Sequence, residues 1–165
     1  MRTIAIATLA ASGALLASAP ALAAPAQVNV TVGPELQEKA DKSLGQREVR
    51  DLARDLQASI EKRLAKSGAF DGQRIDLVLT DARPNRPTFK QMADRPGLSY
   101  QSFGTGGASI EGQAIAPNGH VTPLSYAYFE SDIRYARFGG TWADAESTFD
   151  RFAYRLARGD LVASR

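Results

Sequence analysis

The sequence predicts an α+β domain, a two-layer sandwich in which two amphipathic helices cover one face of a mixed sheet of about four strands. Three observations lead to this prediction. Residues 28–32 alternate apolar and polar side chains, as half-buried strands do, and residues 75–79 place Ile75, Leu77 and Leu79 on one strand face. Between them, residues 46–66 carry an apolar stripe at helical spacing. A β-hairpin at 108–130 is followed by a second such stripe at 141–158.

The composition is that of one ordinary globular domain. Of the 165 residues, 44% are hydrophobic and 23% are charged, which fits a single folded unit. The formal net charge is +2, and basic and acidic residues are interleaved, so no nucleic-acid surface is indicated. The chain has no cysteine, which excludes disulfides, thiolate catalysis and cysteine-ligated metals.

The N-terminus has the pattern of a secretory signal peptide over residues 1–23. Arg2 precedes an apolar run at 4–16, and Ala21-Leu22-Ala23 gives an A-x-A cleavage site. A transmembrane anchor is disfavoured because the run is short and no bulky or charged residue stops it. No lipidation cysteine follows, and the composition is rich in Ala and Arg, as in bacteria. We therefore predict a soluble periplasmic or secreted domain over 24–165, without a transmembrane anchor after cleavage.

The first half of the domain is predicted to form a strand, a helix and a strand. A short helix over 35–44 would place Leu36, Ala40 and Leu44 on one face. The helix over 46–66 has the clearest apolar stripe, formed by Val49, Leu52, Ala53, Leu56, Ile60 and Leu64. Its charged face is interpreted as solvated rather than as a partner surface. The following strand, 74–82, should run parallel to the first through a right-handed crossover.

The hairpin register depends on the turn at 116–120. A two-residue Asn-Gly turn would pair Ala116 with Val121, whereas a type I turn with Pro117 at its second position would pair Ala116 with His120 through a bulge. Proline's fixed φ and missing N–H favour the second. That register also separates the side chains cleanly, which the other does not. One face carries Ala108, Ile110, Gly112, Ala114, Leu124, Tyr126 and Tyr128, and the other carries Ser109, Glu111, Gln113, Pro123 and Ser125.

Further features of the second half concern packing. Pro123 falls at a non-hydrogen-bonded position, which predicts that its strand is an edge. Gly112 and the alanines are expected to leave room for a helix. Thr141 and Asp144 are spaced as in a capping box at the start of the last helix. Its stripe is predicted to pack as core rather than to line a ligand pocket, and comprises Trp142, Ala145, Phe149, Phe152, Ala153 and Leu156.

The segment 83–107 is a long loop rich in proline and glycine, and loops of this length are often functional. Its candidate ligand- or partner-binding residues are Arg83, Asn85, Arg86, Lys90, Ser99 and Tyr100. Arginine donors and stacking aromatics would suit an anion or a polymer. A surface loop pinned to the core by its aromatics is the favoured alternative, because nothing in the sequence fixes the arginines. Gly104–Gly107 lacks the ending and the following helix of a phosphate loop.

No catalytic constellation is evident. His120, the only histidine, falls at the hairpin tip without a partner. Ser99, Ser109 and Ser125 have no second candidate base. Glu111 and Glu130 with Asp132 are the carboxylates that could pair for acid–base chemistry, but the chosen register places Glu111 opposite Ser125 on the polar, solvated face. We therefore predict no catalytic residue, no metal ligand and no cofactor.

Three short motifs carry a resemblance. Asp81-Ala82-Arg83-Pro84 ends a strand, Gly106 to Glu111 opens the hairpin, and Trp142-Ala143-Asp144-Ala145 opens the last helix. In this order the chain resembles the small exported bacterial envelope proteins grouped as domains of unknown function. The resemblance covers most of the mature chain and implies an α/β sandwich in the cell envelope, with no activity to transfer to particular residues.

The expected function is that of a non-catalytic binding or interaction module, whose partner would be an envelope protein or polymer. One alternative is a periplasmic hydrolase acting on an envelope polymer. Another is a protein that self-associates into a homo-oligomer through the edge strand at 123–130, by β-augmentation.

Overall fold

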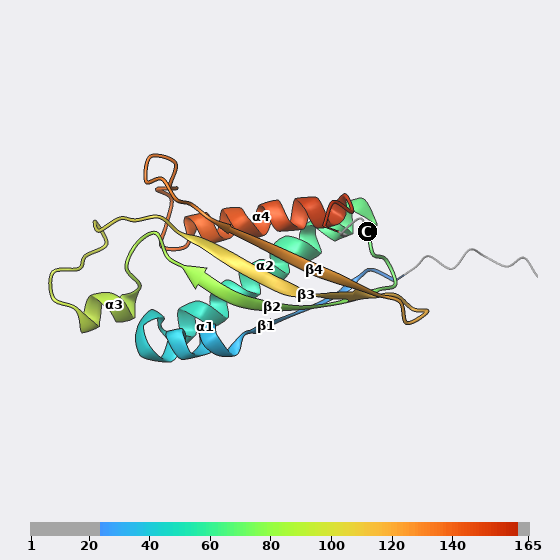
Figure 1. Cartoon of the computed structure of the whole chain (residues 1–165), viewed down its shortest axis with the longest axis horizontal. Coiled ribbons are helices and arrows are strands. Elements are labelled where there is room, and N and C mark those ends of the chain that lie inside the picture. Colours follow the sequence, from blue (N-terminus) through green and yellow to red (C-terminus); the bar gives the residue numbers. More distant parts are fainter. Residues whose placement is uncertain (1–23, 162–165) are drawn as a thin grey trace, which may run out of the picture.

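The structure, a computed structural model, describes residues 24–161. The predicted signal peptide, residues 1–23, lies outside the described residues. The described part forms a four-stranded mixed sheet with helices packed against it (Figure 1), which confirms the predicted α+β fold class. Within residues 24–161, no helix is both long enough and apolar enough to span a membrane.

The sheet has the order β1-β2-β3-β4. Its strands are β1 (Gln27–Val32), β2 (Arg74–Arg83), β3 (Gly107–Ile115) and β4 (Val121–Phe129). β1 and β2 are parallel, as predicted, and the other two pairs are antiparallel. β4 is therefore an edge strand of this sheet, as Pro123 predicted.

Between β1 and β2 the chain forms α1 (Pro34–Lys39), a π-helical turn (Ala40–Leu44) and α2 (Gln46–Ser67). Gly33 N donates to Leu79 O over 2.9 Å. Hydrogen bonding to β2 therefore continues up to the residue before α1. The predicted apolar face of this segment is confirmed, because Leu36, Ala40 and Leu44 are all buried.

The hairpin has the predicted bulged turn. Ala116 N donates to His120 O over 2.9 Å, and Gly119 N donates to Ala116 O over 2.9 Å. Gly119 has φ +83°, the left-handed conformation that this turn requires of it. The predicted register follows, with Ala108 opposite Tyr128 and Gln113 opposite Pro123.

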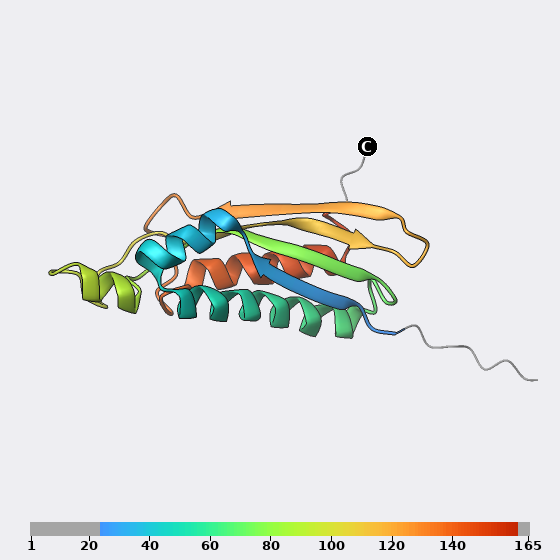
Figure 2. The same ribbon diagram turned by 90° about the horizontal axis from the view of Figure 1, so that it is seen from below.

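α2 and α4 (Ala143–Ala157) lie on the same face of the sheet (Figure 2), as predicted. The Tyr126 ring packs against Phe152, with 6.2 Å between ring centroids. The apolar side chains of both helices and of the inner sheet face form one core, whose largest members include Leu52, Leu56, Ile60, Ile75, Leu77, Leu79, Ile110, Phe149, Phe152 and Leu156.

The space at Gly112 is taken up by a neighbouring strand, a constraint that was not predicted. A Cβ atom at this position would lie 2.1 Å from Asp76 O and 2.8 Å from Leu77 Cα, both in β2. Glycine is required here because β2 occupies the space of a side chain.

Two further expectations need correction at the end of the sheet. The capping box at Thr141 is wrong, because α4 has Trp142 as N-cap and no side-chain cap. Instead, a capping box starts a helix that was not predicted, α3 (Phe89–Asp94). Gln91 N donates to Thr88 Oγ1 over 3.2 Å, and Thr88 N donates to Gln91 Oε1 over 3.0 Å. The prolines at 87 and 96 flank this helix rather than interrupt it.

Candidate functional site

Two segments meet at the end of the sheet where β2 and β4 finish, and we call them together the loop end: residues 83–106, which include α3, and residues 130–142 (Figure 1). The rings of Phe103 and Phe138 stack with 4.3 Å between centroids. Asn85 N donates to Thr141 O over 2.7 Å. The two segments thus form one unit although the whole hairpin separates them in sequence.

The Asp144 carboxylate binds both segments from the first turn of α4. It accepts hydrogen bonds from Asn85 Nδ2 at 2.6 Å, Gly106 N at 2.9 Å and Arg137 N at 3.0 Å. In return, Asp144 N donates to Asn85 Oδ1 over 2.8 Å. Both side chains are buried, where an unpaired charge would be costly. The predicted binding residue Asn85 therefore lies inside a bracing network rather than on the surface.

Glu48, in the first turn of α2, holds the same two segments from the other helix. Its carboxylate accepts from Phe89 N at 2.8 Å and from Trp142 Nε1 at 3.3 Å. Glu48 is not predicted from the sequence as a site residue. Its partners are 41 and 94 residues away, and a glutamate near a helix N-terminus is otherwise explained by the helix dipole.

Arg86 is the centre of the predicted loop site, and the structure brings it together with Tyr100. Its guanidinium donates to Tyr100 O over 2.6 Å and to Phe138 O over 3.3 Å. It also lies over two aromatic rings, 4.9 Å from the Tyr100 centroid and 5.3 Å from that of Phe103. These contacts favour the interpretation in which the aromatics fix the loop.

The remaining predicted residues are not gathered at one point. Arg83 donates to Glu130 O over 3.1 Å and lies 5.1 Å from the Phe129 ring centroid. Lys90 pairs with Asp94 at 2.8 Å within α3. Ser99 Oγ accepts from Gln101 N over 3.2 Å in a local turn. A shallow pocket of about 310 Å³ is lined by Arg83, Asn85 and Arg86 among others, but not by Lys90, Ser99 or Tyr100.

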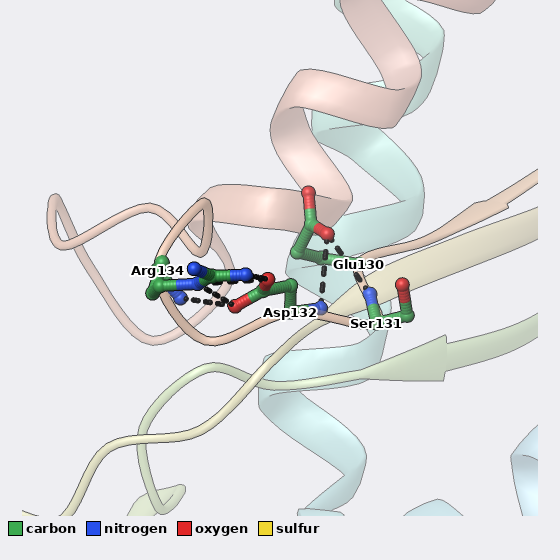
Figure 3. Close-up of polar contacts among 4 residues, drawn as sticks. All are labelled: Glu130, Ser131, Asp132 and Arg134. Carbon is green, nitrogen blue, oxygen red and sulfur yellow. Dashed lines mark hydrogen bonds and ion pairs between the residues drawn. The ribbon is translucent and has the colours of Figure 1, made fainter.

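The carboxylate pair Glu130 and Asp132 forms a tight turn after β4 (Figure 3). Glu130 Oε1 accepts from Ser131 N at 2.9 Å and Asp132 N at 3.1 Å, while Tyr128 OH donates to Glu130 Oε2 over 2.7 Å. The Arg134 guanidinium donates to both oxygens of Asp132, with Nε at 3.0 and 2.9 Å.

These bonds lower the pKa of both carboxyl groups. For Glu130 the main cause is the Tyr128 hydroxyl, and for Asp132 it is the Arg134 side chain. A general acid at neutral pH needs the opposite shift. His120 is exposed at the hairpin tip, where the sequence placed it. The candidate carboxylates thus act in shaping a turn.

The exposed apolar surface is concentrated at the loop end. Seven large hydrophobic residues are exposed among the described residues, and the two outside the loop end are Val121 and Tyr154. The other five are Phe89 (80% exposed), Tyr135 (70%), Phe138 (67%), Ile133 (53%) and Tyr100 (50%). Single exposed apolar residues are normal, whereas contiguous apolar patches are typical of contact surfaces.

A groove runs from the loop end along α4. Two adjoining pockets of about 370 and 700 Å³ share Arg137, Ser147 and Arg151. The Arg151 guanidinium lies 4.3 Å from the Tyr128 ring centroid. Within residues 24–161 neither Arg137 nor Arg151 forms an ion pair with a carboxylate. The groove therefore places two guanidinium groups beside exposed aromatics, together with the carboxylates of Glu130, Asp144, Glu146 and Asp150.

Comparisons with protein-family models, with curated proteins and with solved structures found no match. The resemblance to small exported envelope proteins stays a prediction from the sequence.

Proposed function

We propose that this chain is an exported, non-catalytic binding module of the bacterial cell envelope, and that the loop end contacts its partner. The observation that carries the proposal is the concentration of five exposed large hydrophobic side chains on these two segments. Export rests on the signal-peptide pattern of residues 1–23.

The bracing of the loop end supports a role in binding. Asp144, Glu48 and Arg86 hold the two segments to each other and to both helices. Loops that are ordered before contact lose less conformational entropy on binding, so more of the contact energy appears as affinity. The lowered pKa values of Glu130 and Asp132 argue against either carboxyl group as a general acid at neutral pH.

The test is a capture experiment from a bacterial envelope extract with residues 24–165 as bait. The variant Phe89→Ser/Tyr135→Ser removes two exposed side chains of the loop end. Arg86 is avoided because its loss would loosen the loop itself. The matched control is Val121→Ser/Tyr154→Ser, which removes the two exposed side chains elsewhere. We expect the first variant to lose the partners that wild type and control retain. Identical partner sets for all three proteins would mean that the exposed side chains of the loop end do not contact the partner.

Self-association through β4 is a second candidate, favoured by the sheet order, which gives this strand a single neighbour among the described strands. Exposed edges can pair with a second chain. Pro123 lacks the N–H that such pairing would use at its position. Sedimentation equilibrium of residues 24–165 tests this candidate, and a strict monomer at high concentration would argue against it.

A further inference from the structure

We infer that the partner of the loop end is a membrane surface that contains anionic phospholipid. This inference rests on the proposed function and names the class of partner. It is drawn from the charge, the chemistry and the shape of the loop end.

Basic residues outnumber acidic residues in the two segments of the loop end. The segments 83–106 and 130–142 contain six basic residues (Arg83, Arg86, Lys90, Arg95, Arg134 and Arg137) and three acidic residues (Asp94, Glu130 and Asp132), a surplus of three. The whole chain has a surplus of only two, so all other residues together carry a surplus of one negative charge. The Glu48 and Asp144 carboxylates, which brace the loop end, offset part of this surplus, but both are hydrogen-bonded within the bracing network. Arg83, Arg95, Arg134 and Arg137 are exposed, and exposed cationic side chains at one end orient that end towards an anionic surface.

The exposed side chains have the composition of a membrane-interface anchor. Phe89, Tyr100, Tyr135 and Phe138 are aromatic and Ile133 is aliphatic, and arginines lie among them. Tyrosine rings settle at the level of lipid head groups, phenylalanine and isoleucine side chains enter the apolar boundary beneath them, and arginine pairs with phosphate. A glycan would stack on the rings but would gain nothing from an exposed isoleucine. A bilayer interface can bind aromatic, aliphatic and arginine side chains alike.

The shape of the molecule allows such contact. In Figure 1, α3 projects beyond the end of the sheet and the segment 130–142 rises beside the start of α4, both at the end away from the hairpin tip. Projecting segments can enter a head-group layer without a change in the fold behind them. Within residues 24–161 no helix can span a bilayer, so this contact would be peripheral and reversible.

The experiment measures co-sedimentation of residues 24–165 with vesicles. One set contains equal parts of phosphatidylcholine and phosphatidylglycerol, and the other contains phosphatidylcholine alone. We expect binding to the mixed vesicles that weakens as NaCl is added, because the cationic contribution is screened. The variant Phe89→Ser/Tyr135→Ser should bind at least about tenfold more weakly, since two interfacial anchors are lost. Arg95→Gln should bind about fivefold more weakly.

Matched controls are Val121→Ser/Tyr154→Ser for the apolar change and Arg50→Gln, on the exposed face of α2, for the charge. Both should bind as wild type does. Far-UV circular dichroism and a thermal midpoint establish that each variant is folded. No binding, equal binding to both vesicle types, or equal loss in variants and controls would overturn the inference.

The vesicle and capture experiments separate the two proposals. If vesicles are not bound but Phe89→Ser/Tyr135→Ser still loses a protein or glycan partner from a lipid-free extract, the membrane inference fails and the proposed function stands. If that variant is unchanged in both experiments, both proposals fail.

Discussion

The Asp144 carboxylate decides how the two segments of the loop end are held. Its two oxygens accept three hydrogen bonds, one from a buried side-chain amide and two from backbone N–H groups that belong to different segments. A charged acceptor suits this place because its bonds are stronger than those of a neutral one. The sequence predicted that Asp144 caps α4 together with Thr141. Capping a helix and bracing the loop end both require an acidic residue near the start of the helix, so the sequence does not distinguish them.

We predict that Asp144→Ala destabilises the protein by about 3 kcal/mol, since Gly106 N would be buried without an acceptor and Asn85 Nδ2 would keep only its bond to Gly104 O. Urea unfolding at neutral pH measures the change. The control is Asp94→Ala, which removes an exposed carboxylate paired within α3 and should cost no more than about 0.5 kcal/mol. Equal effects of the two substitutions would contradict the bracing role.

Two glutamates should give opposite pH dependences of stability. Hydrogen bonds, first that from Tyr128, lower the pKa of Glu130, so its stabilisation is present above the ordinary glutamate value, about 4.3, and is lost as pH falls through the folded value. Burial, with Asp55 and Asp150 nearby, raises the pKa of Glu146. Its ionisation therefore costs stability as pH rises through the folded value.

We accordingly predict that Glu130→Gln is less stable than wild type at neutral pH and that Glu146→Gln is more stable. Both differences should shrink as pH falls, because wild type then carries neutral carboxyl groups too. The measurement is the free energy of unfolding in urea at a series of pH values. A difference that grows on acidification would show that the sign is wrong for that residue.

Among the elements, the hairpin of β3 and β4 was predicted almost completely, while α3 was not. The hairpin is determined by local rules: a proline that fixes one turn, and a two-residue alternation that fixes the register. α3 is six residues long, too short for an apolar stripe to distinguish it from a loop. Its capping box, Thr88 with Gln91, was the signal available in the sequence.

The closest approach within the sheet is at Gly112, where β3 passes β2. We predict that Gly112→Ala destabilises the protein by at least about 2 kcal/mol, because the added methyl group would overlap the backbone of β2. Thermal unfolding followed by circular dichroism measures it. Gly139→Ala is the matched control, since its nearest neighbour would be the Ala143 Cβ at 4.0 Å. A Gly112→Ala protein as stable as that control would contradict the strand register at this point.

For the whole molecule, one core joins the sheet, both long helices and the base of the loop end. Phe152 is fully buried against the sheet, whereas Tyr154 on the same helix is exposed.

Trp142, the only tryptophan, lies at the loop end and reports on it through fluorescence, while circular dichroism reports on the helices.

We predict that Phe152→Ala costs about 4 kcal/mol and Tyr154→Ala less than about 1 kcal/mol. We also expect Trp142 fluorescence and circular dichroism to give the same denaturation midpoint in each protein, because the loop end is bonded to both helices and should unfold with them. An earlier fluorescence transition would mean that the loop end opens separately from the core.

The sequence alone determined the strands, the long helices, their buried faces and the hairpin register, because each follows from side-chain periods or turn rules that act over a few residues. Only the tertiary structure decided the loop end. Its bonds join residues that are far apart in sequence, such as Asn85 with Asp144 and Glu48 with Trp142. No local pattern selects such partners, since each polar residue alone is equally compatible with a cap, a solvated face or a ligand site. The positions of Arg83 and Arg86, which were predicted to bind a partner, depend on contacts with the segment 130–142.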